Sequence, residues 1–364
     1  MPEIHAQRRR RLAAAVQQTG VDAALITRLV NVRYLTGLAS SNAAVLIRPD
    51  GGAVLATDSR YVTAARQIAP DIEIALERTV ATSLAARAAG GGTIRLGIEE
   101  HDVTLALAEA IGKAADQVEL VHLGRPVEDL RIAKDDDELA MIREACAISC
   151  RALEYLYAAG GFAGRTEKEI ARDLENRMFG HGADGPAFET IVASGPNSAI
   201  PHHRPTDRAV ERGDFLKIDF GALYRGYHAD CTRTSVVGAQ PTEWQREVYE
   251  LVATAQQAGR AALAPGVEYA AVDRAARELI KAAGYGEHFG HGTGHGVGLE
   301  IHEAPTIGYS AEGKLVDRTS VTVEPGVYVP GRGGVRIEDT LVVRDGADPE
   351  LLTTTTKDLL VLDA

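Results

Sequence analysis

Two aspartates, Asp219 and Asp230, stand eleven residues apart in a stretch whose hydrophobic residues alternate on either side of a glycine- and tyrosine-containing centre. This pattern predicts a β-hairpin with one aspartate on each arm. With an even loop centred on Tyr224–Arg225, the aspartates would face each other at about 5 Å between Cβ atoms, where like charges destabilise a sheet. A divalent cation between them would remove that repulsion. Two alternatives stay open. A three-residue loop with a bulge at Gly226 would remove the direct pairing of the aspartates, and aspartates that are exposed to solvent at a sheet edge would need no ion.

Two glutamates near the C-terminus lie in alternating apolar stretches. Glu324 is expected to end a strand at a Pro-Gly turn, and Glu338 to lie on another strand with Arg336 two residues back on the same face. The apolar neighbours predict burial, and buried carboxylates must be paired or coordinated. Together with Asp219, Asp230 and one histidine, they form the oxygen- and nitrogen-donor set that suits two divalent ions.

Glycine occupies every second position from 290 to 298 in the stretch FGHGTGHGVGLEIH. His291 and His295 have the i, i+4 spacing of a helical zinc pair, but five glycines exclude a stable helix and leave extended chain. Alternating glycines would let another backbone approach one face, while His291, Thr293 and His295 share the other face. Four of the eleven histidines lie between 288 and 302, so a ligand histidine and a structural histidine both stay open here.

The composition limits the kinds of protein that this chain can be. The chain has 364 residues, of which 45% are hydrophobic and 25% charged, as expected for a soluble globular enzyme of two or more domains. A net charge of -12 argues against nucleic acid or anionic membrane as a partner. No stretch approaches 18 consecutive apolar residues, which argues against an ordinary transmembrane helix. Three cysteines do not make a disulfide framework, and we expect a cytoplasmic protein.

Residues 1–130 alternate helical and strand patterns, including strands near 23–26 and 43–47, and predict an α/β domain. The run Gly90–Gly92 is expected to be a loop. Residues 131–364 begin with a long helix headed by the acidic segment 134–138, and a second helix opens at Thr166 with a capping box. Later helices are expected near 242–263 and 269–283. The helix at Thr166 leads to the hairpin with the two aspartates, and the helix near 269–283 leads to the strands with the two glutamates, which hints at an internal duplication.

At this point four stretches carry a family resemblance: 219–234, 289–302, VEPG at 323–326 and VRIEDT at 335–340. They resemble the pita-bread metallopeptidases, in particular the Xaa-Pro branch of prolidases and aminopeptidase P. Residues 32–60, with RYLTG and SSNAA, resemble the creatinase-type domain that precedes the catalytic domain there. The resemblance implies an α+β protein in which a smaller α/β domain (1–130) precedes an internally duplicated pita-bread catalytic domain (131–364).

The resemblance also implies a site. All five family ligand positions for two divalent ions match: Asp219, Asp230, His295, Glu324 and Glu338. Mn²⁺ is the expected metal, with Co²⁺, Zn²⁺ and Fe²⁺ open. A hydroxide bridging the two ions would attack the peptide carbonyl, and Glu324 would move the proton.

Further residues receive expected roles from the same resemblance. His202 and His302 would contact the substrate or the developing oxyanion, with His203 a weaker candidate. His291 would line the proline-side pocket. Arg336 would bind the substrate or form an ion pair with a carboxylate.

We therefore expect a homodimeric metallo-exopeptidase that hydrolyses the Xaa-Pro bond of dipeptides or short peptides, as a dipeptidase or an aminopeptidase. Methionine-type or broader aminopeptidases, a creatinase-like hydrolase and a binding module are the alternatives. Between His302 and Glu324, where relatives commonly have basic residues and a PGM-type turn, this chain has Thr306 after Pro305, and Asp317–Arg318 where Pro-Gly would be expected. If a cation there clamps the C-terminal carboxylate of a dipeptide, it must be Lys314 or Arg318.

Overall fold

The computed structural model describes residues 2–90 and 93–364. Gly91 and Gly92, in the glycine run expected to form a loop, lie outside the described residues. The chain divides into two compact units, Met1–Arg131 and Ile132–Ala364. Among the helices described, none is long and apolar enough to cross a membrane.

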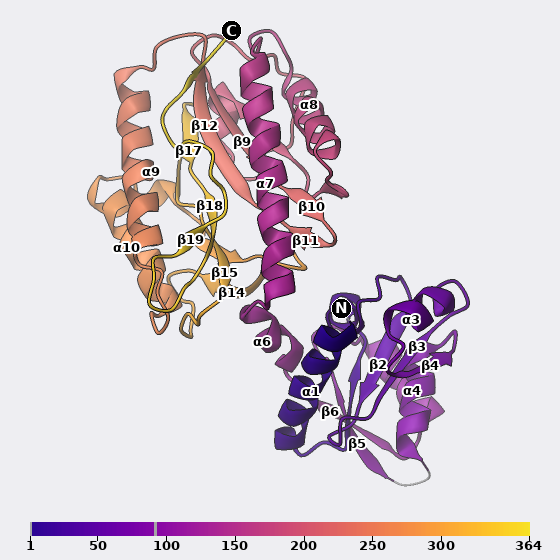
Figure 1. The fold of residues 1–364 in the computed structure, drawn as a ribbon. Helices are drawn as coiled ribbons and strands as arrows, with labels where there is room; N and C mark the ends of the chain where they lie inside the picture. The colour runs from indigo at the N-terminus through magenta and orange to yellow at the C-terminus, as the bar shows by residue number, and fades with distance from the viewer. Residues whose placement is uncertain (1, 91–92) are drawn as a thin grey trace. The chain divides into compact units, whose positions relative to one another are not determined.

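A six-stranded mixed sheet forms the centre of the first unit, in the order β4–β3–β2–β1–β5–β6 (Figure 1). Its strands are β1 (Ala23–Ile26), β2 (Ala43–Ile47), β3 (Ala53–Thr57), β4 (Glu73–Leu76), β5 (Ile94–Ile98) and β6 (Val118–His122). Its helices are α1 (Pro2–Thr19), α2 (Leu29–Thr36), α3 (Val62–Ile68), α4 (Val80–Ala89), α5 (Leu105–Ala114) and α6 (Pro126–Ile132). Strands β1 and β2 match the sequence prediction, whereas the pattern did not single out the short elements α2, β4, α4 and β6.

Four long helices frame the second unit: α7 (Asp136–Ala159), α8 (Glu167–Gly180), α9 (Glu243–Ala261) and α10 (Tyr269–Ala282). Asp135 and Glu138 form a reciprocal capping box at the start of α7, so the acidic segment is a helix start as predicted. Thr166 and Glu169 form the predicted box on α8. Short 3₁₀ helices η1 (Gly195–Ala199) and η2 (Gly286–His288) lie in the connections.

The strands of the second unit form four small sheets, in the orders β11–β10–β7, β20–β12–β9–β8, β14–β13–β15–β18–β19 and β16–β17. Their bounds are β7 (Gly185–Pro186), β8 (Ile191–Ser194), β9 (Phe215–Phe220), β10 (Ala222–Tyr224), β11 (Tyr227–His228), β12 (Cys231–Val237), β13 (Gly294–Gly296), β14 (Glu303–Ile307), β15 (Ser320–Val323), β16 (Gly326–Val329), β17 (Gly333–Arg336), β18 (Asp339–Val342), β19 (Glu350–Leu351) and β20 (Val361–Leu362).

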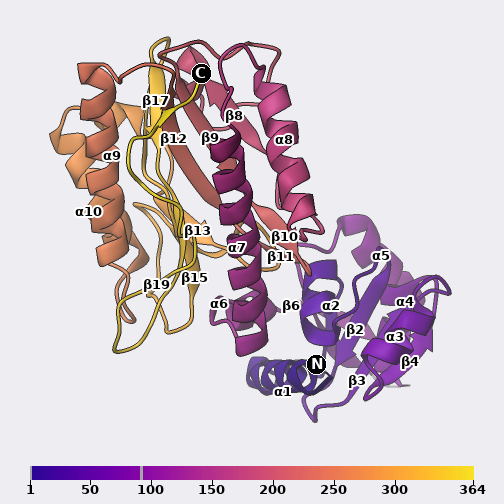
Figure 2. The ribbon, with the colours of Figure 1, turned by 45° about the horizontal axis from the view of Figure 1, so that its top comes forward.

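Each half of the second unit places a helix pair before antiparallel strands. Both views show α7 beside α8 and α9 beside α10, with strands between the two pairs (Figures 1 and 2). The first pair packs on β9 through a core that includes Leu216, Ile218 and Phe220. The second pair packs on β16 and β17 through Val327 and Val335. This repeated order supports the predicted duplication.

The hairpin that carries the two aspartates has a different register from the predicted one. Asp219 on β9 lies opposite Thr232 on β12. The turn is centred on Arg225–Gly226, one residue later than predicted, and both residues have positive φ (48° and 82°), as a type I′ turn requires. Asp230 lies two residues before Thr232, so the aspartates are diagonal neighbours and not direct partners.

The alternating glycines allow backbones to approach closely, as predicted. A Cβ at Gly294 would lie 2.0 Å from the carbonyl oxygen of Thr322, and one at Gly296 would lie 2.2 Å from that of Ala304. Only three residues of this stretch form a regular strand, β13, which runs between β14 and β15. The glycines therefore let β13, which carries His295, lie close to its neighbours β14 and β15.

Candidate metal centre

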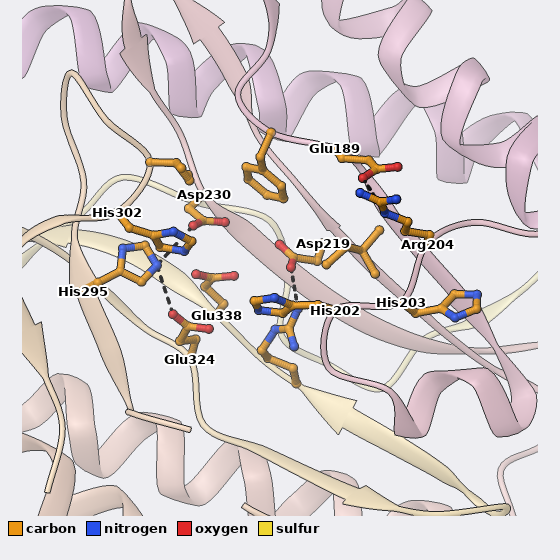
Figure 3. A pocket seen from close by; sticks show the side chains of 14 residues that line it. Glu189, His202, His203, Arg204, Asp219, Asp230, His295, His302, Glu324 and Glu338 are labelled. Carbon is orange, nitrogen blue, oxygen red and sulfur yellow. Dashed lines mark hydrogen bonds and ion pairs between the residues drawn. The ribbon is translucent and has the colours of Figure 1, made fainter. Parts of the chain in front are cut away.

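The five expected ligands come from five separate segments that meet at one place (Figure 3). Asp219 lies on β9, Asp230 directly before β12, His295 on β13, Glu324 directly after β15, and Glu338 between β17 and β18. The predicted strand position of Glu338 is wrong. Its segment leaves the sheet of β17 and enters that of β18, and Glu338 donates its backbone N–H to the carbonyl of Thr232 at 3.1 Å.

The distances bring these side chains within reach of shared ions. Donor atoms of Asp230, His295 and Glu338 all lie within 4.8 Å of one another. His295 Nε2 lies 3.5 Å from Asp230 Oδ2 and 3.2 Å from Glu324 Oε1. Asp219, Asp230 and Glu338 are buried.

Burial and the repulsion between neighbouring carboxylates both act on this cluster. Burial raises the pKa of Asp230 and Glu338 well above the ordinary range, and the neighbouring carboxylates raise it further. For Glu324 burial acts in the same direction, but the hydrogen bond and charge of His295, with the charges of Arg336 and His291, outweigh it and lower the pKa to about 2.

The donor set fits divalent cations. Asp219 Oδ1 and Glu338 Oε1 are buried and have no hydrogen-bond partner among the described residues. A buried carboxylate oxygen without a partner is costly, and a hard divalent ion would satisfy it. One imidazole with four carboxylates is a set that Mn²⁺, Co²⁺, Zn²⁺ or Fe²⁺ can use.

Threonines that the sequence analysis did not single out hold the carboxylates in place. Thr232 Oγ1 donates to Glu338 Oε2 at 2.7 Å, and Thr322 Oγ1 donates to Glu324 Oε1 at 3.1 Å. Each threonine stands two residues from an expected ligand, Asp230 or Glu324, which is the signal that could have found them.

Arg336 is a buried cation beside the cluster. Its guanidinium pairs with Asp219 and donates to Thr232 Oγ1 at 3.0 Å and to Tyr328 Oη at 2.7 Å. It also donates to the carbonyl of Pro201 at 3.3 Å. These contacts support the expected role of carboxylate partner, and because Arg336 also lines the cavity, its expected contact with substrate stays a prediction.

A cavity of about 280 Å³ opens beside the cluster, with His202, His203 and His302 in its walls. The His302 ring packs edge-on against His295 at 4.3 Å between centroids. Burial, then the charge of His295, lowers the pKa of His302, which favours a neutral imidazole. Apolar wall comes from Phe188, Ile191 and Ile301.

His291 lies outside the residues that line this cavity. Its Nε2 is 2.9 Å from Tyr328 Oη, and its ring packs edge-on against Phe289. Its expected contact with proline stays a prediction.

Neither predicted carboxylate clamp reaches the cavity. Arg318 pairs with Asp136 at 2.5 Å, at the start of α7, because its segment runs back to that helix. Lys314 is exposed and forms a backbone bridge with Glu268. The exposed cation on the cavity wall is Arg204, which pairs with Glu189 at 3.0 Å (Figure 3). Sequence reasoning missed it, although it follows the expected residue pair 202–203.

Glu167 anchors the loop that carries His202 and His203. This fully buried carboxylate accepts hydrogen bonds from His203 at 2.8 Å and from Ser194, Asn197 and Thr206 at 2.7–3.0 Å. Burial raises its pKa, but these donors together lower it to about 2. His203 is thus tied to Glu167 while it lines the cavity.

A second group of possible ligands, Glu99, His101 and Glu128, lies in the first unit. Asn31 Nδ2 donates to both carboxylates, at 2.6 and 3.0 Å, and Arg28 pairs with Glu128. These contacts hold both carboxylates by protein donors, and among the described residues Glu128 Oε2 and His101 Nδ1 have no hydrogen-bond partner.

The sequence profile of metallopeptidase family M24 matches residues 140–345, and that of the creatinase/prolidase N-terminal domain matches residues 8–133. The chain belongs to family M24. This M24 peptidase is 37% identical to the Xaa-Pro dipeptidase of Pyrococcus furiosus over 97% of its length and 99% of that protein.

Two solved structures resemble this M24 peptidase closely. An Xaa-Pro dipeptidase from Bacillus anthracis superposes with a TM-score of 0.93 at 37% identity, covering 98% of this chain and 100% of that one. An X-Pro aminopeptidase from Thermotoga maritima gives 0.87 at 37% identity, covering 97% and 99%. The predicted pita-bread fold and creatinase-type N-terminal domain are confirmed.

The contacts of Glu167 predict a pH-dependent stability. Its folded-state pKa of about 2 is below the ordinary 4.5, so it contributes roughly 2–3 kcal/mol above pH 4.5 that is lost as the pH falls toward 2. Glu167→Gln should be less stable than wild type at pH 6, and the difference should shrink steadily below pH 4.5. Denaturant unfolding of both proteins in chelator measures this, with Glu175→Gln on the same helix as control. A difference that is constant with pH would contradict the assignment.

Proposed function

We propose that this M24 peptidase is a two-metal exopeptidase that hydrolyses the Xaa-Pro bond of dipeptides or short peptides. The observation that carries the proposal is the convergence of Asp219, Asp230, His295, Glu324 and Glu338 on the wall of one cavity. The names of its relatives, dipeptidase and aminopeptidase, supply the substrate class.

The same five residues would hold the two ions. Bound divalent ions supply an activated water at neutral pH and polarise the scissile carbonyl. Glu324 also takes and returns a proton in this proposal, since it lines the cavity and is fixed by Thr322 at 3.1 Å. Mn²⁺ as the native metal, a homodimer and a cytoplasmic location are further parts of the proposal.

Proline in the second position explains the need for a dedicated site. An Xaa-Pro bond is a tertiary amide without an N–H, so an enzyme cannot hold it through that donor and needs a pocket shaped to the ring. As for any peptide bond, the leaving nitrogen must receive a proton as the bond breaks, and Glu324 would deliver it. His202 and His302, on the cavity wall, would donate hydrogen bonds to the oxyanion that develops on the carbonyl oxygen.

Arg204 is our candidate for binding the C-terminal carboxylate of a dipeptide. It is 83% exposed, and its pair with Glu189, which is 63% exposed, is of a kind that contributes little stability. A substrate carboxylate can therefore bind Arg204 beside Glu189, or displace Glu189, at a small cost in free energy. Recognition of this charge favours a dipeptidase over an aminopeptidase.

Methionine-type or broader aminopeptidase activity, creatinase-like hydrolysis and binding without catalysis remain the competing functions. The last two would be expected to accompany a substituted ligand position, and all five positions carry donor side chains here.

Activity on Xaa-Pro peptides tests the proposed function. After Mn²⁺ loading, Leu-Pro should be hydrolysed, chelation should abolish the activity, and Mn²⁺ should restore it. Glu324→Gln should lower kcat by about 10³-fold, because a proton-transfer group and a ligand atom are lost together. Glu312→Gln, at an exposed position, is the matched control. Robust cleavage of Met-Ala-Ser with no cleavage of any Xaa-Pro peptide would refute the specificity.

A substrate pair tests Arg204. Arg204→Met should raise KM for Leu-Pro by about 10- to 100-fold, the loss expected for a hydrogen bond to a charged group. The effect on Leu-Pro-amide, which lacks the carboxylate, should be within about twofold. Equal effects on both substrates would show that Arg204 does not recognise that carboxylate. Preference of the wild type for Leu-Pro-Pro would instead identify an aminopeptidase.

A further inference from the structure

Lys217 is a lysine with no exposed surface, on the same strand as Asp219. Burying an ammonium is costly unless its N–H groups are paired, so its contacts indicate why it is there. We infer that Lys217 is a positioning residue that holds the loop carrying His202 in place. The inference rests on the proposed function, in which His202 contacts the oxyanion.

The amine of Lys217 binds consecutive parts of one loop. Its Nζ donates to the carbonyl of Ser198 at 3.0 Å and that of Ile200 at 2.7 Å, with Pro201 at 3.4 Å. A lysine has three donors and no acceptor, which matches three converging carbonyls. The next residue in the chain is His202.

Strand geometry explains why this position can do so. Lys217 and Asp219 are two residues apart on β9, so their side chains leave the same face of the sheet. Asp219 points into the metal cluster, and Lys217 lies one step away from it, over the ring of Tyr328 at 4.9 Å. The proposed metal centre and the His202 loop are thus held from one strand.

Arg336 joins the same arrangement. It donates to the carbonyl of Pro201, which also lies near Lys217, while it pairs with Asp219. At the other end of the loop, Glu167 accepts hydrogen bonds from His203 and Thr206. The loop that carries His202 is therefore held by Lys217 and Arg336 on one side of this histidine and by Glu167 on the other.

His202 depends on this backbone support. It is exposed at the cavity wall, and among the described residues its ring has no hydrogen-bond partner. Its placement therefore comes from the backbone before and after it. Without Lys217, the buried carbonyl of Ser198 and the carbonyl of Ile200 lose this donor, while the carbonyl of Pro201 keeps that of Arg336. The loop is then expected to shift until water reaches the Ser198 carbonyl.

A double-mutant cycle tests this inference. Lys217→Met should lower kcat for the best Xaa-Pro substrate by about 10- to 100-fold, with KM and the number of bound Mn²⁺ ions unchanged. Because Lys217 acts through His202, the double variant with His202→Ala should be no slower than His202→Ala alone, within about threefold. Lys168→Met, which removes an exposed lysine paired with Asp207, should match wild type.

The inference would be overturned by losses that multiply in the double variant, by a loss of Mn²⁺ that parallels the loss of kcat, or by full activity of Lys217→Met. Lys217→Gln, which keeps an N–H donor, should show a smaller loss than Lys217→Met. If neither variant folds, Lys217 serves the fold itself and the inference also fails. Wild-type cleavage of Xaa-Pro peptides is measured separately. If it fails, the proposed function fails, and the cycle is run with whichever peptide the wild type cleaves.

Discussion

The mutual repulsion of four closely placed carboxylates is the constraint on which the rest of the catalytic unit depends. Asp219, Asp230 and Glu338 are buried, and Glu324 is nearly so. The buried guanidinium of Arg336 pairs with one of them, which leaves excess negative charge in a medium where charge is expensive. Bound cations would supply the missing compensation, and the surrounding structure holds the carboxylates ready for them.

The backbone creates this arrangement with few regular elements. The glycines of β13 let neighbouring strands approach until His295 lies among the acids. Glu338 sits where the chain passes from one sheet to another, and Thr232 fixes its side chain. Each of the five proposed ligands therefore depends on a different segment, so small shifts in any of these segments would disturb the site.

Residue type and spacing made the cluster predictable. Acids in apolar strands had to be buried, and buried acids had to be paired or coordinated, so Asp219, Asp230, Glu324 and Glu338 could be grouped before any coordinates. The helix starts at Asp135 and Thr166 were equally clear from their capping residues.

The details that failed depend on conformation that pattern alone does not contain. The hairpin register depends on the positive φ of Arg225, which allows the turn to be centred one residue later than predicted. The roles expected for Lys314 and Arg318 required knowing where a long connection runs. No sequence pattern singles out Lys217, because its carbonyl partners lie 16–19 residues earlier in the chain.

Counting the bound metal tests the central claim most directly. Metal-free protein titrated with Mn²⁺ and followed by electron paramagnetic resonance should bind two ions per chain, with a spectrum of two magnetically coupled ions. Asp230→Asn should weaken that binding. One isolated ion per chain, no tight binding, or full peptidase activity in the metal-free protein would contradict the account.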